Sequence, residues 1–153
     1  MNPAFLESLT IQTHDTIIEN SGGLPGIKNL GLIQSAVNRP FHGTADGKEF
    51  YGDLFKKTAA LTQSLSLNHG FEDGNKRTGL AMGMMFLFRN GFYIPEQDIK
   101  TTTDFALEIT NADHSRRLNI DQISEWFKSK AKIKEQNIME DYIKVIKNIR
   151  LEY

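Results

Sequence analysis

Apolar side chains recur every three to four residues along most of this chain, and this spacing predicts a protein built of helices. We expect helices over residues 2–18, 30–38, 53–67, 79–89, 96–110 and 119–130. Asn2-Pro3 has the form of a helix cap followed by proline in the first turn. The glycine-rich stretch 21–26 separates the first two helices, and Asn90-Gly91 ends the fourth.

Two shorter segments interrupt the helical pattern. Residues 92–94 are apolar, end at Pro95 and are expected to be extended. Residues 41–52 alternate glycine with aromatic residues and predict a loop or a small hairpin around Asp46-Gly47.

Gly79 and Gly83 lie inside the apolar helix 79–89, where glycine weakens the helix. Their spacing of four residues puts them on one face. We therefore expect another helix to pack closely there.

The tail after residue 130 carries one apolar stripe, made of Ile138, Tyr142, Ile146 and Ile149, with Ile143 beside it. An apolar stripe of this kind must be covered by another part of the protein or by a partner. We predict a catalytic domain over residues 1–130 and a helical extension over 131–153 that packs on the same domain or on a partner. Self-association through the stripe is the alternative.

Composition and net charge limit the classes of protein to which this chain can belong. The chain has 153 residues, a formal net charge of −1 and no cysteine. One domain with a substantial core is expected, without disulfides or thiolate metal sites. The charge does not favour nucleic acid or an anionic membrane as a partner. No secretory leader or long apolar run is evident, so we expect a cytoplasmic protein.

Residues 69–78 concentrate the candidate chemistry just before the apolar helix. A helix start offers unpaired N–H groups and the positive end of the dipole to an anion. Gly74 permits a tight turn and close approach of a ligand, and Asn75 would either cap the helix or donate its amide to a phosphate. Arg77 offers a planar fork of donors, whereas Lys76 is a mobile point charge.

Three further residues complete this segment. Asp73 is a hard oxygen ligand suited to a magnesium ion that also touches substrate phosphates. His69 is a candidate general base, because histidine side chains titrate near neutral pH. Phe71 is expected to anchor the turn in the core. Taken singly, such residues belong more often to an ordinary turn or a solvated surface than to a functional site. The spacing after Gly74 also excludes a P-loop.

The segment resembles the signature of the Fic/Doc family, in its Doc branch, at His69-x-Phe71-x-Asp73-Gly74-Asn75-Lys76-Arg77. Further similarity runs in order through 14–23, 26–36, 39–40, 53–60, 86–87 and 90–91. The resemblance extends from about residue 11 to residue 127. It implies an all-α bundle with a central motif helix and a short flap or hairpin.

The resemblance also implies an activity. Doc-like enzymes transfer phosphate from Mg-ATP to a threonine of elongation factor Tu and stop translation, and we expect a toxin of this type. His69 would be the base, Asp73 the metal ligand, and Gly74, Asn75, Lys76 and Arg77 the phosphate cradle. The alternative is protein adenylylation (AMPylation). The adenylylating branch has a second glycine where this chain has Lys76 and a further arginine at the position of Leu80.

Partners follow from the same resemblance. Gly47, Lys48, Glu49 and Phe50 occupy the flap position, where family members align a protein target by strand-like pairing. No Ser/Thr-x-x-x-Glu-Gly/Asn inhibitory motif is present, so we expect a separate antitoxin. A catalytically idle partner-binding module is the third possibility.

Overall fold

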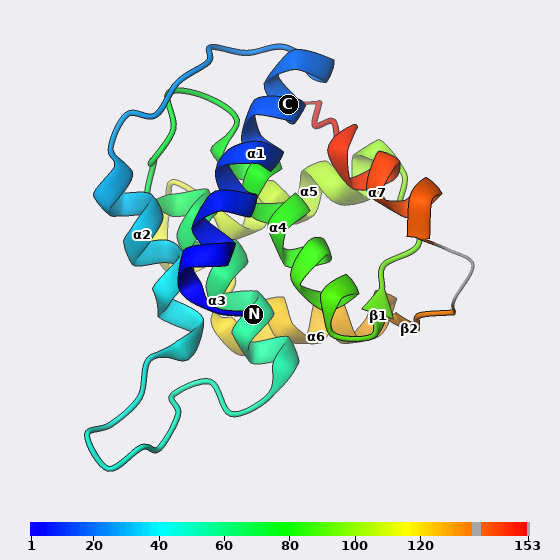
Figure 1. Cartoon of the computed structure of the whole chain (residues 1–153). Helices are drawn as coiled ribbons and strands as arrows, with labels where there is room; N and C mark the ends of the chain where they lie inside the picture. Colours follow the sequence, from blue (N-terminus) through cyan, green and yellow to red (C-terminus); the bar gives the residue numbers. More distant parts are fainter. Residues whose placement is uncertain (136–138, 153) are drawn as a thin grey trace.

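The computed structural model describes residues 1–135 and 139–152. Its helical elements and strands are arranged around one central helix, α4 (Figure 1). In chain order they are α1 (Pro3–Ser21), α2 (Leu30–Asn38), η1 (Arg39–Phe41), α3 (Leu54–Leu67), α4 (Asn75–Arg89), β1 (Phe92–Tyr93), α5 (Ile99–Ile109), η2 (His114–Arg116), α6 (Ile120–Lys130), β2 (Lys132–Ile133) and α7 (Met139–Lys147). The expected all-α Fic/Doc-like bundle is confirmed.

Helix α4 is the core of the molecule. Every residue from Thr78 to Phe88 is buried. A Cβ at Gly79 would clash with Ser66 Oγ and stand 2.9 Å from the Thr62 carbonyl oxygen of α3. At Gly83 it would clash with Thr62 Oγ1. The close helix contact predicted from these two glycines is therefore confirmed, and α3 provides it.

Side-chain caps set where most helices begin. Asn2 accepts a hydrogen bond from the Phe5 amide, as its position before Pro3 predicts. Asp53 caps α3 in the same way. Helix α5 begins at Ile99, so the expected start at residue 96 is wrong. The reason is Asp98, which takes the cap position and accepts from the Thr101 amide at 2.8 Å.

The extended piece after α4 forms a strand, as expected, and its partner lies beyond α6. Strands β1 and β2 pair antiparallel, with Phe92 opposite Ile133 and Tyr93 opposite Lys132. The second strand has only two residues and no alternating pattern, so it could not be predicted from the sequence.

The loop over residues 41–52 projects from the body as a hairpin, at the lower left of Figure 1. A single antiparallel bridge between Gly43 and Glu49 closes it, and Gly47 supplies the positive φ of the turn, +90°. Phe50 is 61% exposed. Lys57 on α3 ties the hairpin to the body through Glu49 Oε1 at 3.0 Å.

Helix α7 returns to the body and packs on α1 and α4. Its Tyr142 and Ile146 and the following Ile149 are buried in the main core. The Tyr142 hydroxyl accepts from the Ile94 amide at 2.9 Å, and burial raises the pKa of Tyr142 to about 12. Ile138 lies outside the described residues. The division into a domain over 1–130 and an extension over 131–153 stays a prediction.

Candidate active site

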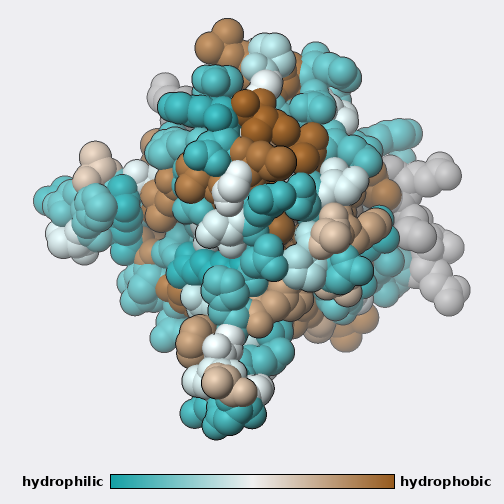
Figure 2. Space-filling view, turned by 60° about the vertical axis from the view of Figure 1, so that its left-hand side comes forward, coloured by the Kyte–Doolittle hydropathy of each residue, from teal (hydrophilic) through white to brown (hydrophobic). Residues whose placement is uncertain are grey.

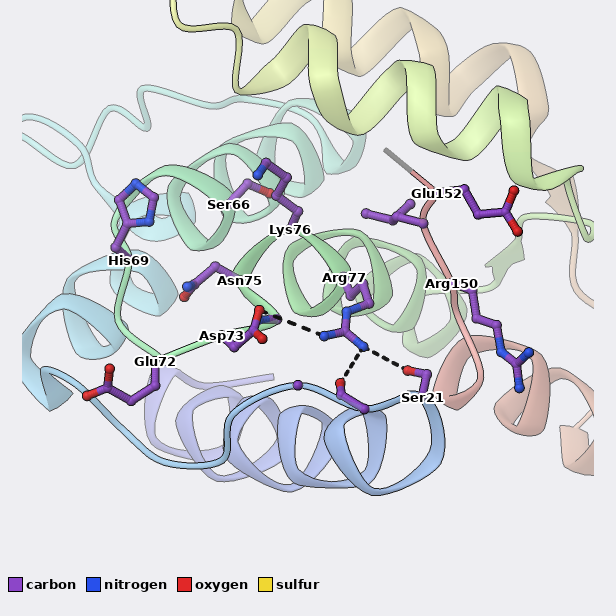
Figure 3. A pocket seen from close by; sticks show the side chains of 14 residues that line it. Ser21, Ser66, His69, Glu72, Asp73, Asn75, Lys76, Arg77, Arg150 and Glu152 are labelled. Atoms are coloured by element: carbon purple, nitrogen blue, oxygen red, sulfur yellow. Dashed lines mark hydrogen bonds and ion pairs between the residues drawn. The ribbon is translucent and has the colours of Figure 1, made fainter.

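The signature segment lines a cavity of about 560 Å³. The start of α4 and the loop before it form one wall, and the end of α1 with the glycines after it forms another (Figure 3). A third group of lining residues comes from the tail, at positions 150–152. The lining residues therefore come from three separate parts of the chain.

The signature loop is held in place by strand-like pairing with the segment before α2. The Lys28 and Asn29 amides both donate to the Gly70 carbonyl, and the Glu72 amide donates to the Gly26 carbonyl. Gly70 is needed there, because a Cβ would meet the Ile33 side chain. This pairing fixes the loop before α4 begins.

Phe71 is 2% exposed, which confirms its expected role as the anchor of the turn. Its ring stacks on the imidazole of His14, with centroids 3.8 Å apart and planes 7° apart. His14 Nε2 donates to the Asp73 carbonyl at 2.8 Å, because a carbonyl oxygen can only accept. His14 Nδ1 lies 3.1 Å from Asp15 Oδ1.

His14 is the supporting residue that the sequence did not single out. It is completely buried and joins α1 to the signature loop across 59 positions. A signal did exist, because Thr10, His14 and Ile17 follow one another at helical spacing on the buried face of α1. A histidine in an apolar stripe suggests a core contact, but not which backbone carbonyl it meets.

Gly74 makes the turn into α4 with φ +75°, the left-handed conformation that favours glycine. It is also the N-cap of α4 and offers no side-chain cap. Asn75 does not cap the helix, so that option is wrong. Its Oδ1 accepts from the Phe71 amide and its Nδ2 donates to the Phe71 carbonyl, both at 3.0 Å. The first amides of α4 thus face the cavity without a side-chain cap.

Arg77 is held at the floor of the cavity. Its Nη1 donates to Ser21 Oγ at 2.8 Å and to the Gly22 carbonyl at 2.9 Å. Nη2 lies 4.0 Å from Asp73 Oδ1. Glycine is favoured at position 23 by a φ of +119°, and a Cβ there would stand 2.9 Å from Arg77 Nη2 and 2.8 Å from Asp73 Oδ2. This anchoring fixes the direction of the guanidinium.

Asp73 keeps part of its carboxylate open to the cavity. Oδ1 accepts from the Gly74 amide at 2.7 Å and Oδ2 from the Leu24 amide at 3.2 Å, yet the side chain is 48% exposed. Among the described residues, no group of three or more His, Asp or Glu side chains could hold a metal ion. A single carboxylate fits magnesium, which takes most of its ligands from phosphates and water.

His69 lies just after the C-terminus of α3. It does not lie at the start of α4, where its place in the motif suggested that it would be. Within the described part of the chain it is the one non-glycine residue with positive φ, at +53°. The side chain is exposed and lines the cavity. A helix commonly ends with glycine in this conformation. A histidine is kept there at an energetic cost.

Lys76 also lines the cavity, on the first turn of α4 near Ser66 (Figure 3). The structure therefore brings together His69, Asp73, Gly74, Asn75, Lys76 and Arg77. Among the described residues lining the cavity, none comes from the expected flap at Gly47, Lys48, Glu49 and Phe50. Their role in docking a target stays a prediction.

Beside the site lies an apolar surface. Seen from the side of α2, apolar side chains gather on the upper part of the molecule (Figure 2). Large exposed apolar residues of the segment next to the signature loop include Leu24, Ile27, Leu30 and Leu32. Across the described residues, no helix is long and apolar enough to cross a membrane.

Comparisons with known proteins find relatives of this chain. The sequence model of the Fic/DOC family matches residues 4–87. The protein named toxin Doc from Mycolicibacterium smegmatis is 39% identical over 93 residues, 60% of this chain and 71% of that protein. The protein named protein kinase doc from Escherichia phage P1 is 36% identical over 84 residues, 55% of this chain and 65% of that protein.

Proposed function

The chain belongs to the Fic/DOC family, and we propose that it is a Doc-type toxin that transfers phosphate from ATP to a serine or threonine hydroxyl of a translation protein. Elongation factor Tu is the proposed target. The observation that carries this proposal is the uncapped start of α4, which faces a cavity lined by Lys76 and Arg77. The relative named as a protein kinase supports ATP as the phosphate donor.

His69 would act as the general base. The hydroxyl oxygen of the target attacks the terminal phosphorus of ATP, the bond from that phosphorus to the bridging oxygen breaks, and ADP leaves. The hydroxyl proton passes to His69. This role needs an exposed imidazole at the mouth of the cavity, and His69 is exposed there.

Arg77 and the first amides of α4 would bind the transferred phosphate. Ser21 and Gly22 orient the guanidinium beforehand, so little reorganisation is needed as charge develops. Lys76 adds a second positive charge. Asp73 would hold the magnesium ion, which when bound neutralises phosphate charge. Asn75 keeps the loop in shape through Phe71.

Partners and location complete the proposal. The protein would act in the cytoplasm and be restrained by a separate antitoxin, whose disordered segment folds on the toxin. The exposed apolar residues beside the signature loop, among them Leu24 and Ile27, support a partner that covers this surface. The hairpin residues 47–50 would align the target.

The test is intact-mass analysis of purified elongation factor Tu after incubation with the protein, magnesium and ATP. A gain of about 80 Da, the mass of one phosphoryl group, supports phosphate transfer. A gain of about 329 Da, the adenylyl group, would instead establish adenylylation. The His69→Ala variant is the control and should give neither product. An unmodified target together with bound ATP would refute elongation factor Tu as the substrate.

A further inference from the structure

The tail beyond α7 forms part of the cavity, although it lies outside the family match. Arg150, Leu151 and Glu152 all line the cavity next to the signature segment, whereas the family match ends at residue 87. Figure 3 shows Arg150 and His69 on opposite sides of the cavity, with Arg77 between them in this view. The tail therefore adds charged groups that the signature does not include.

The backbone on both sides of Arg150 is anchored. Ile149 is 9% exposed and belongs to the main core, and Leu151 packs against the same core. The Glu152 amide donates to Thr103 Oγ1 of α5 at 3.0 Å. Upstream, Asn20 Nδ2 of α1 donates to the Lys147 carbonyl at 3.4 Å. These contacts hold Arg150 at a defined place on the rim.

The guanidinium of Arg150 differs from that of Arg77 in its partners. Arg77 is fixed by Ser21 and Gly22. Arg150 is exposed and makes no hydrogen bond or ion pair with any described residue. Arg150 lines the cavity, and a guanidinium, with its five donors, is suited to a phosphate.

Arg150 also borders a second cavity of about 300 Å³, whose lining includes Met84, Ile94 and Glu96. That lining is mostly apolar, and among the described residues Arg150 is its one cationic side chain. The first cavity carries carboxylates at Glu72, Asp73 and Glu152, but it also holds Lys76 and Arg77. A negatively charged group is therefore favoured on the side of Arg150 that faces the signature loop.

We propose that Arg150 is a nucleotide-binding residue that holds a phosphate of the bound nucleotide from the tail side of the cavity. The inference rests on the proposed function, because it assumes that ATP occupies this cavity. It adds to that function a cation supplied by the tail. Glu152 on the same wall carries the opposite charge, so its removal should favour the same ligand.

Isothermal titration of the full chain with Mg-ATP tests this assignment. Arg150→Ala should raise the Kd for ATP about tenfold, as expected when a charge-assisted hydrogen bond is lost. Arg150→Lys should retain part of the affinity, because it keeps the charge and loses the fork. Adenosine carries no phosphate, so its Kd should be the same for the wild type and for Arg150→Ala.

Two further variants separate charge from tail packing. Arg116→Ala removes an arginine of η2 whose side chain is 75% exposed and should leave the Kd for ATP unchanged. Glu152→Gln should bind ATP as tightly as the wild type or more tightly. Equal weakening by Arg150→Ala and Glu152→Gln, or weaker adenosine binding in Arg150→Ala, would assign the effect to tail packing and overturn the proposal.

The titrations distinguish failure of the proposed function from failure of the role proposed for Arg150. A wild type that binds neither ATP nor adenosine overturns the proposed function itself, and the inference with it. A wild type that binds ATP, with Arg150→Ala binding it at the same Kd, refutes only the role of Arg150. Circular dichroism of each variant confirms that the fold is retained.

Discussion

Replacing His69 by glycine should make the protein more stable and inactive at the same time. His69 has φ +53° just after α3, a conformation that costs an L-residue about 1–2 kcal/mol and glycine almost nothing. The side chain is exposed and makes no hydrogen bond to the described residues. Removal of the His69 side chain therefore removes few packing contacts.

The net gain is smaller than the strain relieved. Glycine increases the entropy of the unfolded chain, which offsets about 0.4–1 kcal/mol. We expect His69→Gly to raise the free energy of unfolding by about 0.5–1 kcal/mol. For a domain of this size that corresponds to an increase in Tm of about 2–4 °C per kcal/mol.

The matched variant is His69→Ala, which removes the imidazole and keeps the Cβ. Urea unfolding of both variants gives the difference in free energy of unfolding, and glycine should exceed alanine by about 1 kcal/mol. Phosphate transfer by both should fall by at least about 100-fold, because both lack the base.

The stability and the activity of these variants test two separate properties of His69, its backbone strain and its role as the base. Equal stability of the glycine and alanine variants would show that the backbone at this position is not strained. Full transfer activity in either variant would show that another group takes the proton. A stabilised and inactive glycine variant would mean that the strain is retained for the sake of the imidazole.

Four other perturbations test the fold and the site. Gly79→Ala should lower the free energy of unfolding by about 1–3 kcal/mol, whereas Gly52→Ala, with no atom within 4 Å of its Cβ, should change it by less than about 0.5 kcal/mol; urea unfolding compares them. His14→Ala should cost about 2–4 kcal/mol and weaken ATP binding in a titration. Wild-type stability should fall as the pH rises from 10.0 towards about 12, because the unfolded chain releases the Tyr142 proton first; Tyr142→Phe should be less stable at pH 7 by about 1 kcal/mol and lose less in that range. Lys76→Gly should shift the product of the mass assay toward adenylylation, and an unchanged product would show that the nucleotide pose is set elsewhere.

Local signals made most of the fold predictable. Asn2 caps α1 as predicted, and Asp53 and Asn119 cap α3 and α6 at the predicted starts of those helices, because a cap depends on neighbours three residues away. The contact at Gly79 and Gly83 was also predictable, since the absence of side chains on one face of a helix has few other uses. Strand β2 was not predictable, because two residues carry no period.

The site was only partly predictable, for a related reason. The motif predicts which side chains line the cavity, but it does not predict the contacts that hold these side chains in place. His14 supports Asp73 from 59 residues away, and residues 26–29 pair with the loop across more than 40 positions. Such contacts depend on how α1 packs against α4, which no local pattern specifies.

The contribution of the tail to the site also depends on contacts between residues that are far apart in the sequence. A cavity built only from the signature loop and the end of α1 would be open on the side where residues 150–152 now lie. Tyr142, Ile146 and Ile149 fix those residues by burial in the core that α4 organises. The apolar stripe of the tail therefore has two effects. Its burial stabilises the body, and the same burial places Arg150 on the rim of the cavity. A tail that merely stabilised the fold would require the stripe and would leave the charge at position 150 irrelevant to nucleotide binding.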